Sequence, residues 1–147
     1  MLVRLLYASR ARQPIDAALL DAILATCLER NPRHGITGVL CHGNGIFLQA
    51  LEGGRHEVSQ LFQAIARDPR HHDVVLLGYE EIRERDFAGW AMGHVNAARI
   101  NPATLMKFSE RAELDPYGTS GQTSLALLKE LIAGASVVSR ASERARP

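Results

Sequence analysis

The 147-residue chain has few of the features that mark several large classes of protein. It has only two cysteines, Cys27 and Cys41, which are too few for the disulfide scaffold of a small secreted domain. No apolar run approaches the ~20 residues that a membrane-spanning helix needs. The N-terminus has no apolar stretch followed by a small-residue cleavage site, so we predict no signal peptide. Together these absences favour a cytoplasmic protein that does not enter a membrane.

The chain also has almost no net charge. Seventeen Lys and Arg residues against sixteen Asp and Glu residues leave +1, so the basic surface of a nucleic-acid-binding protein is not expected. Hydrophobic residues make up 46% and charged residues 22%, as in an ordinary globular domain and unlike a disordered chain. The length suits one domain.

Common catalytic motifs are missing as well. No glycine-rich phosphate loop occurs, and Gly43-Asn44-Gly45 joins two strand patterns, so it predicts a hairpin turn. The six histidines include the pair His71-His72 but show no metal-ligand spacing, so no metal site is predicted. Ser9 and the two cysteines have no base at a suitable spacing, which favours structural roles.

The pattern of apolar residues predicts the order strand, helix, strand, strand, helix, strand, strand. The strands are expected at residues 2–9, 36–42, 46–52, 74–79 and 91–95. The helices are expected from a cap at Asp16 to about Arg30, and from Arg55 to Arg67. The run 74–79 is almost continuously apolar, which is typical of a strand buried on both faces or central in a sheet. Residues 80–85 predict a polar continuation of that strand or a turn.

This order predicts an α+β fold with a ferredoxin-like βαββαββ sheet and two helices on one face. In that topology the first and third strands are antiparallel neighbours, so Tyr7 and Gln49 are expected side by side beneath the helices. Two C-terminal helices are expected at 102–112 and 122–138, followed by a frayed tail.

Several polar residues interrupt these apolar patterns near the two helices. Gln49 lies within an apolar strand, Tyr7 ends an apolar strand face, and Asn31 ends the first helix, while Arg70 and His71 follow the second. Each of these residues also has an ordinary explanation. Gln49 could bond to nearby backbone or lie at a sheet edge, and Tyr7 could lie at the rim of the core. Asn31 could simply end the helix, and Arg70 and His71 could belong to a solvated loop. Taken together, they indicate a slot between two apolar helices with converging polar groups, which suits a flat heteroaromatic ligand.

Five segments, in order, resemble the BLUF family of blue-light sensors that use flavin. They are LLYASRA at 5–11, NPRHGITGVL at 31–40, FLQALEG at 47–53, DPRHHDV at 68–74 and ERDFAGWAMG at 84–93. The resemblance implies a ferredoxin-like sheet that binds FAD between its two helices, in agreement with the fold predicted above.

The resemblance also implies a role for each matching residue. Tyr7 corresponds to the tyrosine that donates an electron and then a proton to the excited flavin, and Gln49 to the glutamine whose amide rearranges afterwards. Asn31 corresponds to the asparagine at the flavin imide edge, and Arg70 and His71 to positions beside the other carbonyl and the ribityl chain. The apolar positions around the ring are Ile23, Ile36, Leu40, Phe47 and Ile65.

Trp90 and Met92 correspond to the last-strand pair that the family links to signal output. Ala91, between them, departs from the serine that is frequent there, and Cys27 replaces a residue that is often small and polar. The resemblance implies a flavin-binding domain at 1–97 and a helical extension at 98–139 that packs on the far face of the sheet and carries the signal. Residues 140–147 are expected to form a disordered tail.

The sequence therefore predicts a photoreceptor that binds FAD non-covalently and is not an enzyme. Its output is expected to pass to a separate effector protein or through a change in a homo-oligomer. Two alternatives stay open. A small flavin-dependent oxidoreductase would be bleached by a reduced nicotinamide, whereas a cofactor-free ferredoxin-like interaction module would be colourless.

Overall fold

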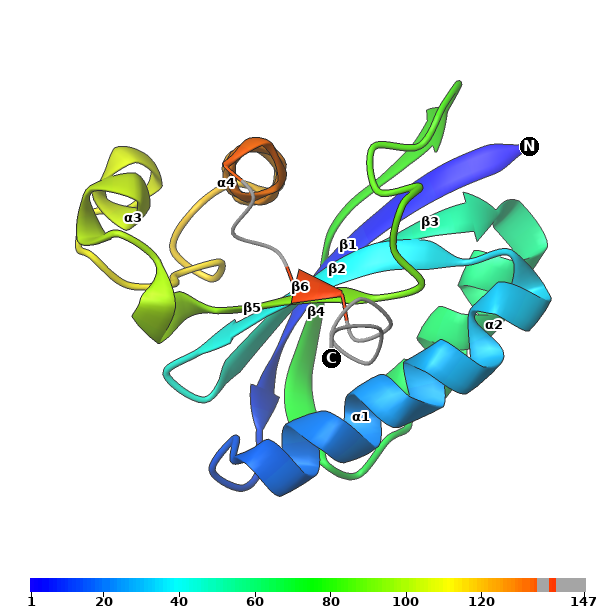
Figure 1. Ribbon diagram of the computed structural model, residues 1–147, viewed down its shortest axis with the longest axis horizontal. Coiled ribbons are helices and arrows are strands. Elements are labelled where there is room, and N and C mark those ends of the chain that lie inside the picture. The colour runs from blue at the N-terminus through cyan, green and yellow to red at the C-terminus, as the bar shows by residue number, and fades with distance from the viewer. Residues whose placement is uncertain (135–137, 140–147) are drawn as a thin grey trace, which may run out of the picture.

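The computed structural model describes residues 1–134 and 138–139, and the predicted tail at 140–147 lies outside them. One mixed sheet has the strand order β4-β1-β3-β2-β5-β6 (Figure 1). The strands are β1 (Leu2–Ala11), β2 (Thr37–Gly43), β3 (Ile46–Gly54), β4 (His71–Ile82), β5 (Gly93–Asn96) and β6 (Val138–Ser139). The helices are α1 (Ala17–Arg30), α2 (Arg55–Ala66), α3 (Pro102–Phe108) and α4 (Gly121–Ala133), with short 3₁₀ turns at Pro32–His34 and Ala97–Arg99. The ferredoxin-like order predicted from the sequence is confirmed.

Local sequence signals determine where the elements begin and end. The Asp16 side chain accepts a hydrogen bond from the Leu19 amide at 2.8 Å and so caps α1, as expected. Asn31 keeps helical dihedral angles and still donates to the Cys27 carbonyl, and the helix ends there because Pro32 has no amide N–H with which to continue the helical hydrogen bonds. Between β2 and β3, Asn44 and Gly45 adopt positive φ angles of 53° and 71°, which a tight hairpin turn requires.

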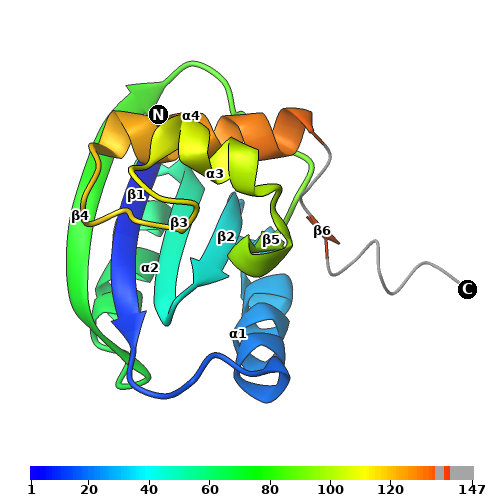
Figure 2. The ribbon, with the colours of Figure 1, turned by 90° about the vertical axis from the view of Figure 1, so that its left-hand side faces the viewer.

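The sheet lies between two helical layers. Helices α1 and α2 cover one face, and α3 and α4 cover the other (Figures 1 and 2). Successive residues of β1 alternate between these faces: Leu5 and Tyr7 join the apolar cluster beneath α1 and α2, while Leu6 joins the cluster beneath α3 and α4. The molecule therefore has two apolar cores, separated by the sheet.

The prediction that the run 74–79 is buried on both faces or central is wrong. Among the strands that the structure describes, β4 forms an edge of the sheet and pairs only with β1. Val75, Leu76 and Tyr79 are 37%, 52% and 44% exposed. An apolar run indicates a strand, but the position of that strand depends on how the whole chain is connected. The polar residues after it continue the strand to Ile82.

Several element boundaries also differ from the predictions: β1 continues to Ala11, and β4 already begins at His71. β5 begins at Gly93, because the backbone just before it bonds outside the β5 ladder: the Trp90 carbonyl accepts from the Gly38 amide at 3.2 Å, and the Ala91 carbonyl accepts from the Asn31 side chain at 2.7 Å. α3 ends at Phe108, before the extended residue Ser109. α4 ends at Ala133, with Gly134 as its cap, and residues 138–139 form β6 instead of helix. None of the helices within the described residues is both long and apolar enough to cross a membrane.

Candidate functional site

A buried pair of polar side chains lies under α1 and α2. Tyr7 of β1 and Gln49 of β3 are partners in the antiparallel ladder, as expected from the topology. They are 4% and 3% exposed, and the Tyr7 hydroxyl donates a hydrogen bond to Gln49 Oε1. Burial, with smaller contributions from Cys27 and Asp68, raises the pKa of Tyr7 far above its ordinary value. The phenol therefore keeps its proton and acts as a donor to the amide.

The other end of the Gln49 amide points to a sulfur atom. Gln49 Nε2 donates to Met92 Sδ at 3.4 Å, and Met92 is completely buried. A thioether is a weak acceptor, whereas the phenol is a good donor to an amide oxygen. The amide is therefore held firmly at its oxygen and loosely at its nitrogen. Of the two hydrogen bonds, the one to Tyr7 is the stronger restraint on the orientation of the amide.

These two side chains border a cavity of about 130 Å³ between α1 and α2. Its lining contains most of the predicted site residues: Tyr7, Ile23, Leu40, Phe47, Gln49, Ile65, Arg70 and His71. About half of the lining residues are apolar and the others carry polar or charged groups, so the cavity offers both apolar walls and hydrogen-bonding groups to a flat aromatic ligand.

Two predicted residues line a neighbouring cavity instead. Asn31 and Ile36 border a second space of about 400 Å³. Arg30, Leu61 and Ala64 line both cavities, so the two spaces adjoin along the slot between the helices. The Asn31 amide is engaged by the Ala91 carbonyl, and the structure does not bring it to Tyr7 and Gln49.

Arg70, which lines the first cavity, forms an ion pair with the neighbouring Asp68. Its guanidinium donates to the Asp68 carboxylate, with the shortest contact at 2.6 Å. These hydrogen bonds hold the pKa of Asp68 below its usual range and raise that of Arg70. The positive charge of Arg70 is thus partly compensated where it faces the cavity.

Both ring nitrogens of His71 are also engaged. Nε2 donates to the Ile65 carbonyl, and Nδ1 lies 2.7 Å from the Ser9 hydroxyl oxygen. The ring meets that of Tyr7 edge-on at 6.5 Å between centroids. Ser9 therefore orients a cavity-lining histidine, which fits the structural role that the sequence favoured for it.

The structure separates Trp90 from Met92. Met92 belongs to the cluster beneath α1 and α2, while Trp90 is half-buried against the cluster beneath α3 and α4. Both lie in the segment before β5 and not within a strand. The pair therefore contacts the two cores on opposite faces of the sheet.

The sequence reading missed several lining residues. They are Thr26, Arg30, Leu61, Ala64 and Asp68, and Cys27, seen only as a departure from the family, lines the cavity too. One face of α1 carries Ile23, Thr26, Cys27 and Arg30 at helical spacing. Extending that spacing from the predicted residue Ile23 would therefore have found the other three residues on α1. Among the described residues, no group of three His, Cys, Asp or Glu side chains is arranged to hold a metal ion.

The fold and the site define a class: a ferredoxin-like domain with a helix-walled slot and a buried Tyr–Gln pair at its sheet. The family model of BLUF, described as sensors of blue-light using FAD, matches residues 2–93. The chain therefore belongs to the BLUF family of blue-light flavin sensors.

Individual relatives agree with this assignment. The photoactivated adenylate cyclase subunit beta of Euglena gracilis is 42% identical over 84 residues, which are 57% of this chain and 10% of that protein. The chain thus spans about a tenth of that relative. BlsA in its photo-activated state is 31% identical with a TM-score of 0.79, covering 90% of this chain and 95% of BlsA. The dark-state structure of the BLUF protein BlrB is 32% identical with a TM-score of 0.76, covering 91% of this chain and 96% of BlrB.

Proposed function

We propose that the slot between α1 and α2 binds FAD non-covalently and that Tyr7 and Gln49 carry out the light response. The observation that supports this most is the hydrogen-bond chain from Tyr7 through Gln49 to Met92 at the edge of the cavity. Bound flavin would supply blue-light absorption and an electron-accepting excited state. Tyr7, a buried phenol that keeps its proton, serves as the electron and proton donor. The loosely held Gln49 amide then changes its hydrogen bonds.

The residues around the slot fit such a ligand. Ile23, Leu40, Phe47 and Ile65 supply apolar walls for a neutral ring. Asn31, with Ile36 beside it, is proposed to hold the imide edge of the ring. Arg70 and His71 are proposed to lie beside the other carbonyl and the ribityl chain.

The adjoining cavity favours the dinucleotide over FMN. Arg30, His34, His56 and Arg67 border it, and only one carboxylate, Glu57, is present among its lining residues. The cationic side chains of Arg30 and Arg67 at the end of the slot suit the two phosphates of FAD. We therefore expect the apoprotein to retain FAD in preference to FMN when both are offered at equal concentration.

In this proposal the chain is a cytoplasmic photoreceptor and not itself an enzyme. Residues 1–97 form the flavin-binding unit and residues 98–139 the output extension. The Euglena relative combines its matching segment with a much longer protein named as a cyclase subunit. By analogy, we propose that this chain signals to a separate effector protein or through a change in a homo-oligomer.

An absorption spectrum in darkness and just after blue light tests the proposal. We expect a flavin band that shifts slightly to longer wavelength and recovers in darkness. A band that does not shift, and that bleaches with a reduced nicotinamide, would indicate a flavoenzyme instead. A protein that stays colourless after FAD is added would be a cofactor-free module, and the proposal would then be wrong.

A further inference from the structure

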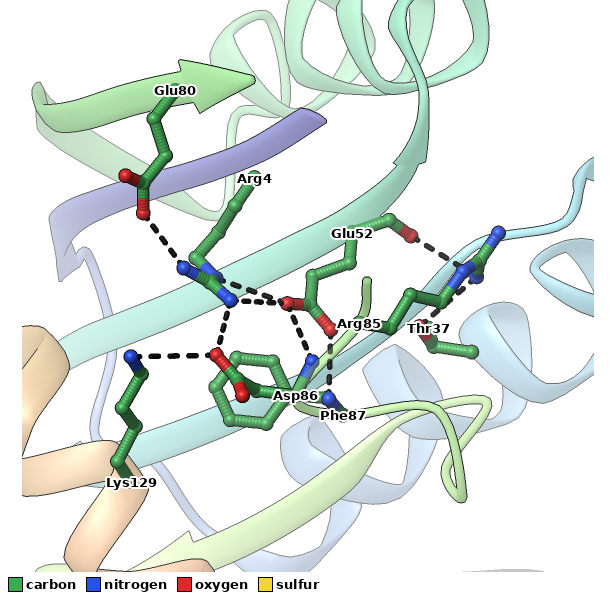
Figure 3. Close-up of polar contacts among 8 residues, drawn as sticks. All are labelled: Arg4, Thr37, Glu52, Glu80, Arg85, Asp86, Phe87 and Lys129. Atoms are coloured by element: carbon green, nitrogen blue, oxygen red, sulfur yellow. Dashed lines mark hydrogen bonds and ion pairs between the residues drawn. The ribbon is translucent and has the colours of Figure 1, made fainter. Parts of the chain in front are cut away.

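One buried carboxylate fixes the segment that joins β4 to β5. Glu52 of β3 is fully buried, and its two oxygens accept from the backbone amides of Phe87 at 2.7 Å and Asp86 at 3.1 Å (Figure 3). Arg4 of β1 compensates the charge, since its Nε lies 2.9 Å from Glu52 Oε2. A buried ion pair with further hydrogen bonds resists breaking, because separating its partners would leave an uncompensated charge.

The same segment, residues 83–92, reaches the proposed light-sensitive amide at its other end. Met92 accepts the weak hydrogen bond from Gln49, and the residue before it accepts from Asn31. Gln49 and Glu52 are three residues apart on β3, so their side chains point to opposite faces of the sheet. Residues 83–92 therefore connect the flavin face to the α3/α4 face.

On the α3/α4 face this segment contacts α4 through an ion pair. The Asp86 carboxylate lies 3.4 Å from Lys129 Nζ, and it also pairs with Arg4. Figure 3 shows Asp86 between the guanidinium of Arg4 and the ammonium of Lys129. Asp86 and Lys129 are 39% and 49% exposed, so this contact is far weaker than the buried pair beside it.

We propose that Glu52 is a positioning residue that holds one end of the 83–92 segment, and that the Asp86–Lys129 pair is the contact through which this segment acts on α4. The inference rests on the proposed function, because it takes Gln49 as the moving group. A change in the Gln49 amide alters its bond to Met92. Glu52 keeps the backbone of Asp86 and Phe87 in place, so the change at Met92 reaches α4 as a reorientation of the exposed Asp86 side chain against Lys129.

The test compares amide hydrogen exchange of α4 in darkness and under blue light, using the full chain with bound flavin. We expect wild type to show a light-dependent exchange rate in α4, and Lys129→Met to reduce the light-to-dark ratio by about two- to fivefold. Lys129→Arg should restore the ratio, because it keeps the charge beside Asp86. The spectral shift of the flavin should be the same in all three proteins.

Lys107→Met is the matched control. Lys107 also pairs with α4, at 2.6 Å from Glu130, but it does not contact residues 83–92. We expect its light-to-dark ratio to equal that of wild type. The inference is wrong if Lys129→Met keeps the wild-type ratio, if both variants lose it equally, or if wild-type α4 shows no response while the flavin band shifts. A flavin band that never shifts would instead contradict the proposed function.

Glu52→Gln tests whether Glu52 holds one end of the 83–92 segment. The variant keeps the shape of the side chain but places a donor opposite the Arg4 guanidinium or the two backbone amides. We expect the light-induced shift of the flavin band to persist, since Gln49 is untouched, and the α4 response to fall at least as much as in Lys129→Met. A folded variant with a wild-type α4 response would overturn the role of Glu52. If the variant does not fold, the Lys129 series still decides whether the segment acts on α4.

Discussion

At the scale of single residues, burial limits how the side chains of Tyr7 and Gln49 can ionise and form hydrogen bonds. The Tyr7 phenol cannot readily ionise within the core, so it donates to Gln49. That bond in turn fixes which way the amide faces, with its nitrogen toward Met92. At the rim of the cavity, the ion pair between Asp68 and Arg70 likewise limits which partners these two side chains can bind.

Tyr7→Phe tests the tyrosine directly. The substitution removes one oxygen from a buried site and leaves the ring, so we expect the protein to fold and to bind flavin. It also removes the proposed electron and proton donor, so the red-shifted state after blue light should be absent. Light-minus-dark absorption spectra measure this. Tyr79→Phe, at a 44% exposed tyrosine of β4, is the control and should respond like wild type. A normal photocycle in Tyr7→Phe would exclude the mechanism.

Cys27 provides a pH test of how closed the cavity is. Burial raises the pKa of this thiol from 9.0 to about 11, although Arg30 and Arg70 partly oppose the shift. Because the thiolate is the reactive form, alkylation by iodoacetamide at pH 8 should be about a hundredfold slower than for an unperturbed thiol. The rate should keep rising with pH up to about 11. Cys41→Ser leaves Cys27 as the reporter, and a rate that levels off near pH 9 would contradict the expected burial.

At the scale of elements, strand pairing was predictable where the chain order decides it. The pairing of Tyr7 with Gln49 follows from a two-residue strand period and one topology, and the cap at Asp16 follows from its side chain alone. The edge position of β4 was not predictable from its apolar run, because nothing within residues 74–79 records which strands lie beside it. The separation of Trp90 from Met92 depends on bonds to Gly38 and Asn31, which are far away in the sequence.

Gly38→Ala tests the close packing of β2 against β3 and the 83–92 segment. A Cβ at Gly38 would lie 2.1 Å from the Ala50 carbonyl oxygen and 3.1 Å from Met92 Cε, so the backbone must shift. We expect the free energy of unfolding to fall by about 1–3 kcal/mol, measured by urea denaturation. Gly89→Ala, where the added carbon meets open space, should stay within about 0.5 kcal/mol of wild type. Equal effects in the two variants would argue against this packing.

At the scale of the whole molecule, the sheet separates two apolar cores that have different roles. The core beneath α1 and α2 shapes the cavity, whereas the core beneath α3 and α4 fastens the C-terminal helices. The order of elements predicted two helices on one face of the sheet, and the family resemblance implied a helical extension on the other face. The sequence did not predict how one segment links the two layers, because Glu52 and Asp86 become neighbours only through folding.

A pair of leucine substitutions tests whether the cores are independent. Leu128 of α4 and Leu24 of α1 are both fully buried, one in each core. Each Leu→Ala variant should lose about 2–5 kcal/mol of unfolding free energy in urea. Only Leu24→Ala should weaken flavin binding in a titration of the folded protein, because α1 is a wall of the slot. An equal loss of affinity in Leu128→Ala would show that the sheet does not isolate the cavity.

The ladder position shared by Tyr7 and Gln49 has a consequence for how such a chain can vary in length. Neighbouring residues of a strand point to opposite faces, so one residue inserted in β1 before Tyr7 without a bulge would turn the phenol toward α4. The hydroxyl and the amide would then lie on opposite sides of the sheet. Insertions and deletions should therefore be tolerated in the surface turns of this domain, but not singly within β1 or β3.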